Sequence, residues 1–327
     1  MSGVDLTGKT IIVTGAGGFF GGHLVRHLCA AGATVRAVVR YNSSSTTGSL
    51  EGLELPQLSV RQFDVRDEES LSALDVGAAD PIYVHLAANI SIPHSYACPD
   101  AHIHTNVLGT YNMLQHARRA GASRFIFISS SEVYGTAQTE FISERHPLVA
   151  QSPYAATKIA GEKLVESWAR SFALPSLVVR PFNLYGPGQS QRAVIARIVA
   201  QALNGGDLML GRLDTLRDFN FVGDTSAAIA RLISVSDHLP PYDVVNIGTG
   251  AAVTIQHVID EVSDILGREL KVSLAEDAMR PDASEVDRLC ADTSHLEELI
   301  GPRELTPFRT GLSRVIDSLT DTGETRA

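Results

Sequence analysis

The sequence predicts an α/β protein with a Rossmann-type, doubly wound parallel sheet followed by a smaller α/β domain. Short apolar runs alternate with segments of helical periodicity through the first 180 residues. The first of these runs, residues 10–14, leads into a glycine-rich turn and then into a helix, as in the first βα unit of such a sheet. From residue 181 onward proline and glycine become frequent and the alternation turns irregular, which indicates a second, smaller domain.

The composition is that of a globular protein, since 327 residues with 44% apolar side chains can bury a large core. A net charge of -10 without a run of basic residues argues against a nucleic-acid partner. Three widely spaced cysteines indicate neither a disulfide framework nor a zinc site: Cys29, Cys98 and Cys290. The N-terminus lacks the pattern of a signal peptide, and no window approaches the ~18 apolar residues that span a bilayer. We therefore expect a cytoplasmic protein that does not enter a membrane.

The turn after residues 10–14 carries glycines at Gly15, Gly18 and Gly21. Glycine lets the backbone turn tightly and approach a pyrophosphate, whose charge then faces the free N–H groups at the start of the next helix. An ordinary glycine-rich turn is the alternative. The strand before the turn and the helix after it favour dinucleotide binding.

The second predicted strand, residues 34–39, ends at Arg40, where an NAD-binding protein usually carries an acid for the adenosine ribose. No Asp or Glu occurs between Gly15 and Leu50. Because an arginine accommodates a 2'-phosphate better than a bare ribose, we expect NADP in preference to NAD. Asn42 could still serve NAD, and a solvated arginine is the alternative interpretation of Arg40.

Residues 60–65 and 82–88 are predicted as the third and fourth strands. Small residues at the end of the fourth strand allow a cofactor to lie across the sheet edge. Four potential metal ligands follow, but they lack a zinc spacing and are interpreted as surface and packing residues: His94, Cys98, His102 and His104. We therefore predict no metal site.

The central segment combines a strand end, a carboxylate and a Tyr/Lys pair. After a predicted helix at residues 100–120, the apolar strand 125–128 ends directly in three serines and Glu132. A proline suits the first turn of the following helix, on which Tyr154 and Lys158 are four residues apart and share one face. Polar groups at a strand end beside such a pair predict a catalytic site.

The last third of the chain follows a strand at residues 177–180 and a break rich in proline and glycine at residues 181–188. Its predicted elements are a sheet strand at 244–247 and helices at 192–203, 224–233 and 255–266. We therefore divide the chain into a first domain at residues 1–180 and a mainly separate second domain at residues 181–327. A segment at about 243–250 returns from the second domain to the sheet.

Several segments resemble, in order and spacing, the extended short-chain dehydrogenase/reductase family of NAD-dependent epimerases and dehydratases: residues 14–21, 85–88, 130–135, 154–158 and 180–187. The likeness is strongest to sugar-nucleotide 4,6-dehydratases of the legionaminate-pathway and GDP-mannose types, through residues 40–43, 131–137, 180–183, 216–222, 280–281 and 284–286. It implies an NAD(P)-binding first domain, a substrate-binding second domain, a nucleotide-diphosphate sugar substrate and a tightly bound, recycled cofactor. It also implies a homodimer formed through two long helices.

The resemblance assigns roles to individual residues. Catalytic roles are implied for Ser130, Glu132, Tyr154 and Lys158. Cofactor contacts are expected from Tyr154 and Lys158 and from Gly15, Gly18, Phe19, Phe20, Gly21, Arg40, Asp64, Val65, Leu86, Ala87 and Ala88. Substrate contacts are expected from Ser131, Asn183, Arg192, Arg217 and Arg280, with Arg217 and Arg280 on the diphosphate. Surface ion pairs are the alternative for these arginines.

The implied reaction needs Tyr154 as a phenolate, although the pKa of free tyrosine is about 10. The Lys158 ammonium and a positive nicotinamide would both favour the anion, while Ser130 forms a hydrogen bond at O4 of the sugar. Once C4 has been oxidised to a ketone, Glu132 could remove the C5 proton and return a proton to the departing C6 hydroxyl. This chemistry predicts an NDP-sugar 4,6-dehydratase that forms a 4-keto-6-deoxy sugar nucleotide.

Two departures keep other reactions open. Glucose-type 4,6-dehydratases carry Asp at the position of Ser131, and dehydratases usually carry Thr at the position of Ser130, where 4-epimerases often have Ser. An NDP-sugar 4-epimerase is therefore the main alternative, followed by a UDP-uronic acid decarboxylase. A non-catalytic cofactor-sensing regulator is the alternative of a different class, but such a protein has no need for Tyr154, Lys158 and a hydroxyl together.

Overall fold

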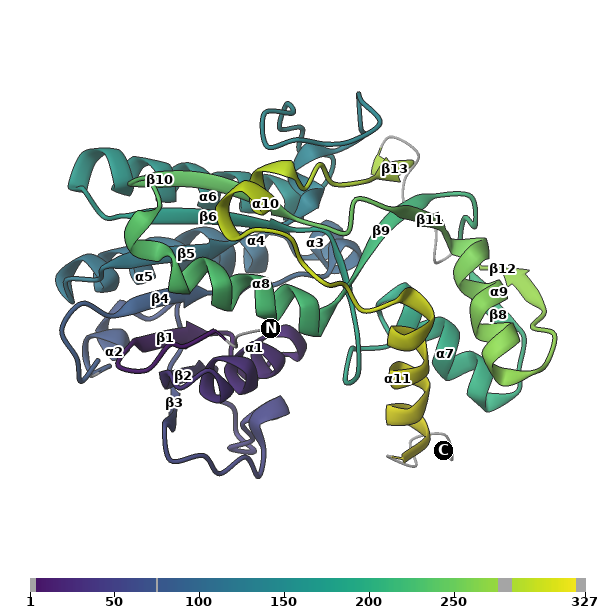
Figure 1. The fold of residues 1–327 in the computed structure, drawn as a ribbon, viewed down its shortest axis with the longest axis horizontal. Coiled ribbons are helices and arrows are strands. Elements are labelled where there is room, and N and C mark those ends of the chain that lie inside the picture. Colours follow the sequence, from purple (N-terminus) through teal and green to yellow (C-terminus); the bar gives the residue numbers. More distant parts are fainter. Residues whose placement is uncertain (1–3, 75, 276–283, 322–327) are drawn as a thin grey trace.

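A seven-stranded parallel sheet forms the centre of the computed structural model, which describes residues 4–74, 76–275 and 284–321 (Figure 1). The strand order is β10-β6-β5-β4-β1-β2-β3. The strands are β1 (Thr10–Thr14), β2 (Thr34–Val39), β3 (Leu58–Gln62), β4 (Ile82–His85), β5 (Arg124–Ile128), β6 (Ser176–Pro181) and β10 (Tyr242–Ile247). The winding direction reverses between β1 and β4, which is where open α/β sheets bind ligands. The predicted doubly wound sheet is confirmed.

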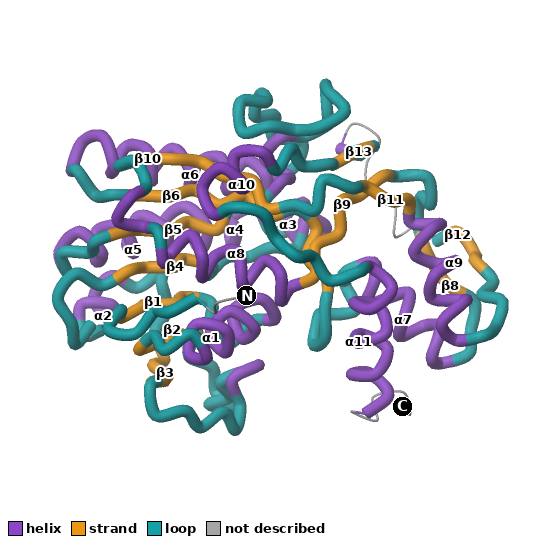
Figure 2. Tube along the Cα trace, viewed as in Figure 1, coloured by secondary structure: helices purple, strands orange, loops and turns teal. Residues whose placement is uncertain are grey.

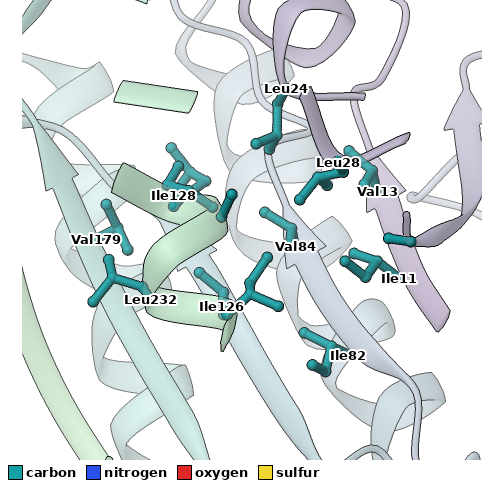
Figure 3. Close-up of a cluster of buried hydrophobic side chains, with 14 of the residues drawn as sticks. Ile11, Val13, Leu24, Leu28, Ile82, Val84, Ile126, Ile128, Val179 and Leu232 are labelled. Atoms are coloured by element: carbon teal, nitrogen blue, oxygen red, sulfur yellow. The ribbon is translucent and has the colours of Figure 1, made fainter. Parts of the chain in front are cut away.

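Helices cover both faces of this sheet because successive strand residues point to opposite sides. On one face Val13 and Ile126 pack with Leu24 of α1 (Phe19–Ala30) and Leu232 of α8 (Val222–Ser234) (Figure 3). Short helix α10 (Ser294–Ile300) contributes to the same cluster. The opposite face packs against α2 (Glu68–Ser72), α5 (Gly109–Arg119) and α6 (Pro153–Phe172).

The helix predicted at residues 100–120 is a composite. It follows α3 (Ile92–Ala97) and consists of α4 (Pro99–His102), a π-helical turn η2 (Ile103–Leu108) and α5. The prediction of one regular helix is therefore wrong in its middle. Periodicity reports only which residues face the core, and it does not distinguish a single wide turn from a regular one.

Some predicted strand ends are also wrong. The third strand spans residues 58–62 and not 60–65, because the Asp64 carboxylate accepts a hydrogen bond from the Arg66 backbone N–H at 3.0 Å and turns the chain away. The fourth strand ends at His85, so the small residues that follow it lie in a loop. The strands predicted at residues 125–128, 177–180 and 244–247 each begin one or two residues earlier.

The smaller part of the molecule contains a second core around three helices. These are α7 (Val194–Asn204), α9 (Ile255–Leu266) and α11 (Phe308–Asp321), at the right in Figure 1. They pack against a four-stranded sheet of β7 (Asn183–Tyr185), β9 (Leu216–Phe221), β11 (Ala252–Thr254) and β13 (Arg288–Leu289). Strands β8 (Leu208–Leu210) and β12 (Val272–Leu274) pair separately at the far end (Figure 2).

The chain crosses between the two parts more than once. Strand β10 pairs with β6 at the edge of the large sheet, and α8 and α10 pack on that sheet as well. Single 3-10 turns complete the secondary structure: η1 (Gly48–Leu50), η3 (Ser131–Tyr134) and η4 (Ser236–His238). The domain boundary at residue 180 stays a prediction. None of the helices in the described part of the chain combines the length and apolar character needed to span a bilayer.

Candidate functional site

A cavity of about 1460 Å³ runs from the carboxyl ends of the large sheet to the strands of the smaller part. Its walls come from the glycine turn after β1, the loops after β2, β3, β4 and β5, the start of α6, and the segments around β7 and β9. Residues far apart in the sequence therefore line one cavity, at the edge of the sheet where the winding direction reverses.

The glycine turn is shaped for close approach of a ligand. Gly15 has a positive φ of 70°, and a side chain there would place Cβ 2.8 Å from the backbone N of Ala87. A Cβ at Gly17 would lie 2.6 Å from the carbonyl oxygen of Thr47, and one at Gly21 would collide with the carbonyl oxygen of Gly15. The backbone of this turn is therefore not covered by side chains, and α1 begins directly after it. A pyrophosphate could approach this backbone and the N-terminus of α1 closely. The crowding at Gly17 was not predicted from the sequence.

The far end of the cavity carries charged groups suited to an adenosine. Asp64 and Arg66 form an ion pair with 2.6 Å between Oδ2 and Nη2. Hydrogen bonds from Arg66 lower the pKa of Asp64, and the charge of Arg40 also lowers it. Arg40 itself is exposed and lines the cavity beside Asn42.

All of the predicted cofactor residues line this one cavity. They are Gly15, Gly18, Phe19, Phe20, Gly21, Arg40, Asp64, Val65, Leu86, Ala87, Ala88, Tyr154 and Lys158. Their shape and charge fit a nicotinamide dinucleotide, with the bare glycine turn in the middle and Tyr154 and Lys158 at the other end. Their individual roles stay predictions.

The four predicted catalytic residues also line the cavity and are brought together by two chain segments. Strand β5 ends at Ile128, and the chain then turns into η3, where the Ser130 hydroxyl accepts a hydrogen bond from the backbone N–H of Glu132 at 3.2 Å. Helix α6 begins beside it, because the Ser152 hydroxyl caps the helix by accepting from the Ala155 N–H at 3.1 Å.

Tyr154 is buried, and this governs its protonation. Burial raises the pKa of Tyr154 to about 12, although a hydrogen bond with the Ser130 side chain lowers it. The negative charge of Glu132, which lines the same cavity, raises it further. At neutral pH the tyrosine is therefore a phenol in the protein alone.

Lys158 is also enclosed, with 3% of its surface exposed. Its Nζ donates a hydrogen bond to the carbonyl oxygen of Ile128 at 2.6 Å and lies 4.3 Å from the centre of the Phe127 ring. Burial lowers the pKa of Lys158 to about 7, while the charge of Glu162 raises it. Both partners of the Tyr/Lys pair are thus far from their ordinary pKa values, as is common in active sites.

The predicted substrate residues approach from the smaller part of the molecule. Asn183 on β7 and Arg217 on β9 line the cavity with Ser131 and Arg192. Ser131 and Arg217 are buried and Arg192 is exposed, whereas Arg280 lies outside the described residues. The Arg217 guanidinium lies 3.5 Å from the carboxylate of Glu285, a cavity residue that sequence reasoning missed.

A second missed residue is Asn106 in the π-helical turn. It is 1% exposed, accepts a hydrogen bond from the Asn89 N–H at 2.7 Å and donates to the Asn89 carbonyl at 3.0 Å. It also donates to the Thr157 hydroxyl at 2.9 Å, on α6 between Tyr154 and Lys158. Nothing in the local sequence signalled these contacts, because they join segments 17 and 51 residues apart along the chain.

The histidine-rich stretch has packing and surface contacts of its own. His102 is buried and its Nδ1 lies 3.0 Å from the carbonyl oxygen of Cys98. The His94 and His102 rings lie 5.4 Å apart, and His104 pairs with Asp100 at 3.7 Å. Within residues 4–74, 76–275 and 284–321, no three His, Cys, Asp or Glu side chains gather as they would around a metal ion.

Comparison with known proteins reveals similarity along most of the chain. The family profile described as GDP-mannose 4,6 dehydratase matches residues 12–315. A dTDP-glucose 4,6-dehydratase of Neisseria gonorrhoeae is 27% identical over 333 residues, which covers 94% of each chain.

Two solved structures have a similar fold. The dTDP-glucose 4,6-dehydratase DesIV of Streptomyces venezuelae, solved with NAD, has a TM-score of 0.85 at 26% identity, covering 96% of this chain and 98% of its own. The epimerase Mth375 of Methanothermobacter thermautotrophicus has a TM-score of 0.87 at 26% identity, covering 97% of this chain and 94% of its own.

Proposed function

Because the chain belongs to the GDP-mannose 4,6 dehydratase family, we propose that it is an NDP-sugar 4,6-dehydratase that forms a 4-keto-6-deoxy sugar nucleotide by transient oxidation at C4. Family membership alone does not specify the reaction, since epimerases share this fold.

The observation that carries the proposal is the presence of a carboxylate, Glu132, in the cavity that also contains Tyr154. Both side chains line the same cavity, and the Glu132 charge acts on the tyrosine strongly enough to raise its pKa. Elimination of water across C5 and C6 needs a base for the C5 proton in addition to the base at O4. Inversion at C4 needs only the latter, so a carboxylate at this point supports dehydration.

The residues divide the proton transfers among themselves. Tyr154 takes the proton from O4, with the Ser130 hydroxyl as its hydrogen-bond partner. A nicotinamide dinucleotide bound in the cavity would accept hydride from C4 and return it at C6. Glu132 removes the proton from C5 of the 4-keto sugar and passes it to the leaving C6 hydroxyl, so that water departs. C5 then takes a proton from solvent as hydride arrives at C6, and Tyr154 releases the O4 proton to solvent. Ser131 lies beside Glu132 and offers a hydroxyl where glucose-type dehydratases carry an acid, so in this chain Glu132 makes both transfers.

We assign the substrate diphosphate to the positively charged side of the cavity. Arg217 is held there by Glu285 and the backbone, which orients its guanidinium in advance of binding. Asn183 and Arg192 complete the expected nucleotide-sugar contacts, together with Arg280 beyond the described residues. The nucleotide base and the sugar are left to experiment.

NAD is the better supported cofactor. The similar dehydratase of Streptomyces venezuelae was solved with NAD. The remaining argument for NADP is Arg40, which lines the adenosine end with no acid before Leu50 in the chain. In either case the reaction regenerates the cofactor within one turnover, so the cofactor can stay tightly bound between turnovers. Identification of the nucleotide released from denatured protein decides between the two, and NADP alone would overturn the choice of NAD.

A 4-epimerase is the second candidate. Ser130 is typical of epimerases, and several epimerases are among the similar structures. An epimerase would leave Glu132 without a proton to move.

We also propose a cytoplasmic homodimer. Exposed apolar side chains on η2 and α6 support an interface there, since Ile103 is 50% and Phe172 is 44% exposed. Sedimentation of the purified protein as a monomer would contradict the dimer.

The reaction is tested by incubating the protein separately with UDP-, GDP-, dTDP- and CDP-hexoses. We expect one of them to lose water and to give a 4-keto-6-deoxy product by mass spectrometry. Recovery of only a C4 epimer of unchanged mass would overturn the dehydratase in favour of the epimerase.

A further inference from the structure

One turn of α6 beyond Lys158, a second ionisable side chain is sealed inside the protein. Glu162 is 1% exposed and follows Lys158 by four residues, so the two side chains share one face of the helix. Neither the cofactor nor the substrate side of the cavity includes Glu162. The proposed chemistry assigns it no task, yet a buried carboxylate is costly unless it is paired.

The Glu162 carboxylate is held by groups from two neighbouring strands. Its Oε2 accepts from Nη2 of Arg180 on β6 at 2.6 Å, and its Oε1 accepts from Nε of Arg180 at 2.9 Å. Oε1 also accepts from the hydroxyl of Ser129 at 2.5 Å, directly after β5. Burial opposes the charge on Arg180, but the hydrogen bonds and charge of Glu162 outweigh it and the pKa of Arg180 lies above its usual value. Arg180 is therefore charged, and its Nη2 lies 2.6 Å from Oε2 of Glu162 as a buried ion pair.

Arg180 is fixed in turn from its other side. Its Nη1 donates to the Tyr134 hydroxyl at 2.8 Å and to the carbonyl oxygen of Glu144 at 3.2 Å. The Tyr134 hydroxyl donates to Oδ1 of Asn246 on β10 at 2.6 Å. The network thus joins the ends of β5, β6 and β10 to η3 and α6. Its hydrogen bonds hold the Glu162 carboxylate in one orientation.

Among the residues that the structure describes, no carboxylate pairs directly with the Lys158 amino group. Its Nζ meets a carbonyl and an aromatic ring, neither of which carries a full negative charge. The neighbouring titratable groups are His85 on β4, Tyr154 and Glu162 on α6, Arg180 behind Glu162, and Glu132 near Tyr154 on η3. Burial and the Lys158 charge lower the pKa of His85 to about 3, so this histidine is neutral, as is Tyr154 at neutral pH. Glu162 is the anion whose charge acts on Lys158.

We propose that Glu162, clamped by Arg180 and Ser129, is a positioning residue that keeps the buried Lys158 amino group protonated for the reaction. It acts through Lys158 and touches neither substrate nor cofactor. This inference rests on the proposed function only for its consequence in catalysis, since the protonation of Lys158 can be observed directly.

The direct test is a pH titration of Lys158 by NMR in the intact protein with its cofactor. The chain has only four lysines, Lys9, Lys158, Lys163 and Lys271, so protein labelled with ¹³C at lysine Cε gives a short spectrum, assigned with Lys158→Arg. In Glu162→Gln we expect the Lys158 transition to move down by about one pH unit or more. The matched control is Glu166→Gln, one turn further along α6, where the carboxylate pairs with Lys163 and Arg170 at the surface. The control should leave the transition unchanged.

A folded Glu162→Gln protein with an unshifted Lys158 transition would overturn the inference. Because Glu162→Gln leaves the buried Arg180 charge unpaired and could prevent folding, the double variant Glu162→Gln/Arg180→Met serves as the second arm. It should also show a downward shift, smaller than that of Glu162→Gln because the Arg180 charge that opposes protonation of Lys158 is removed as well, and an unshifted transition there contradicts the proposal.

In turnover assays the alkaline limb of the kcat profile should move down with the Lys158 transition, while that of Glu166→Gln stays in place. A purely structural role for Glu162 would lower kcat without moving the limb. If the protein proves not to be a dehydratase, the NMR titration still decides on Glu162.

Discussion

At the scale of single residues, burial shifts the pKa of Tyr154 and that of Lys158 in the directions that make both groups neutral. The phenol is raised to about 12 and the ammonium is lowered to about 7. The catalytic pair therefore needs help from charges around it to become a phenolate and an ammonium. The sequence identified the pair from its four-residue spacing, but burial, and with it the size of these shifts, depends on the packed structure.

Tyr154→Phe removes the base at O4 and leaves the shape of the cavity nearly unchanged. We expect kcat to fall by roughly 10²–10⁴-fold, the usual contribution of a positioned acid or base. Steady-state assays on the accepted nucleotide sugar measure the loss. Cofactor content should match that of the unmodified protein, and activity above a tenth of the original would argue against Tyr154 as the base.

Glu132→Gln separates oxidation from elimination. Oxidation at C4 needs only the O4 base, so reduced nicotinamide should accumulate while release of the dehydrated product falls roughly 10²-fold or more. Near-ultraviolet absorbance after mixing with substrate records the reduced form. Unchanged turnover would remove Glu132 from the mechanism.

The lowered pKa of Lys158 also links stability to pH. Its value falls from 10.5 to about 7 on folding, so between about pH 7 and 10.5 the unfolded chain binds more protons than the folded one. The free energy of unfolding therefore increases as pH rises from about 7 to 10.5. Below about pH 7 Lys158 is charged in the folded protein, and the full cost of burying that charge lowers the stability. Lys158→Met should stabilise the protein more at pH 6 than at pH 9 in urea unfolding. An equal effect at both pH values would contradict the lowered pKa.

At the scale of elements, the sheet strands were predictable as short apolar runs and the long helices by apolar residues that repeat with period 3.6. Helix α9 (Ile255–Leu266) was predicted with its correct ends. The π-helical turn was not, since the bonds of Asn106 that accompany it reach Asn89 and Thr157 on other segments. The three-residue strands β7, β8, β11 and β12 are too short to show a period.

The cap of α6 is an element-scale feature with a functional consequence. Ser152→Ala removes the hydrogen bond to the Ala155 N–H and should lower the free energy of unfolding by about 1 kcal/mol. Because Tyr154 lies in the first turn, kcat should fall as well. Thr254→Ala, which uncaps α9 by the same loss of a bond to His257, is the matched control. It should cost similar stability and leave kcat unchanged; equal kcat effects in the two variants would contradict a role of the cap in placing Tyr154.

At the scale of the whole molecule, the cavity joins two parts of the chain that the sequence could only treat separately. The order of motifs predicted the sheet, its cofactor edge and the residues on it. The ion pairs Arg217–Glu285 and Arg180–Glu162 depend on tertiary contacts, so local sequence patterns do not predict them. The sequence therefore predicted residues that line one cavity but could not specify the charges that surround them.

The proposed dehydration is tested most directly by running the reaction in D₂O with the accepted nucleotide sugar. Because Glu132 sends the C5 proton out with the leaving water, C5 must take its new hydrogen from solvent, while C6 receives the hydrogen that left C4. After back-exchange in ordinary water, we expect a product that has lost water and carries a single carbon-bound deuterium at C5 by NMR and mass spectrometry. A product of unchanged composition, inverted at C4 and without carbon-bound deuterium, would contradict the dehydratase.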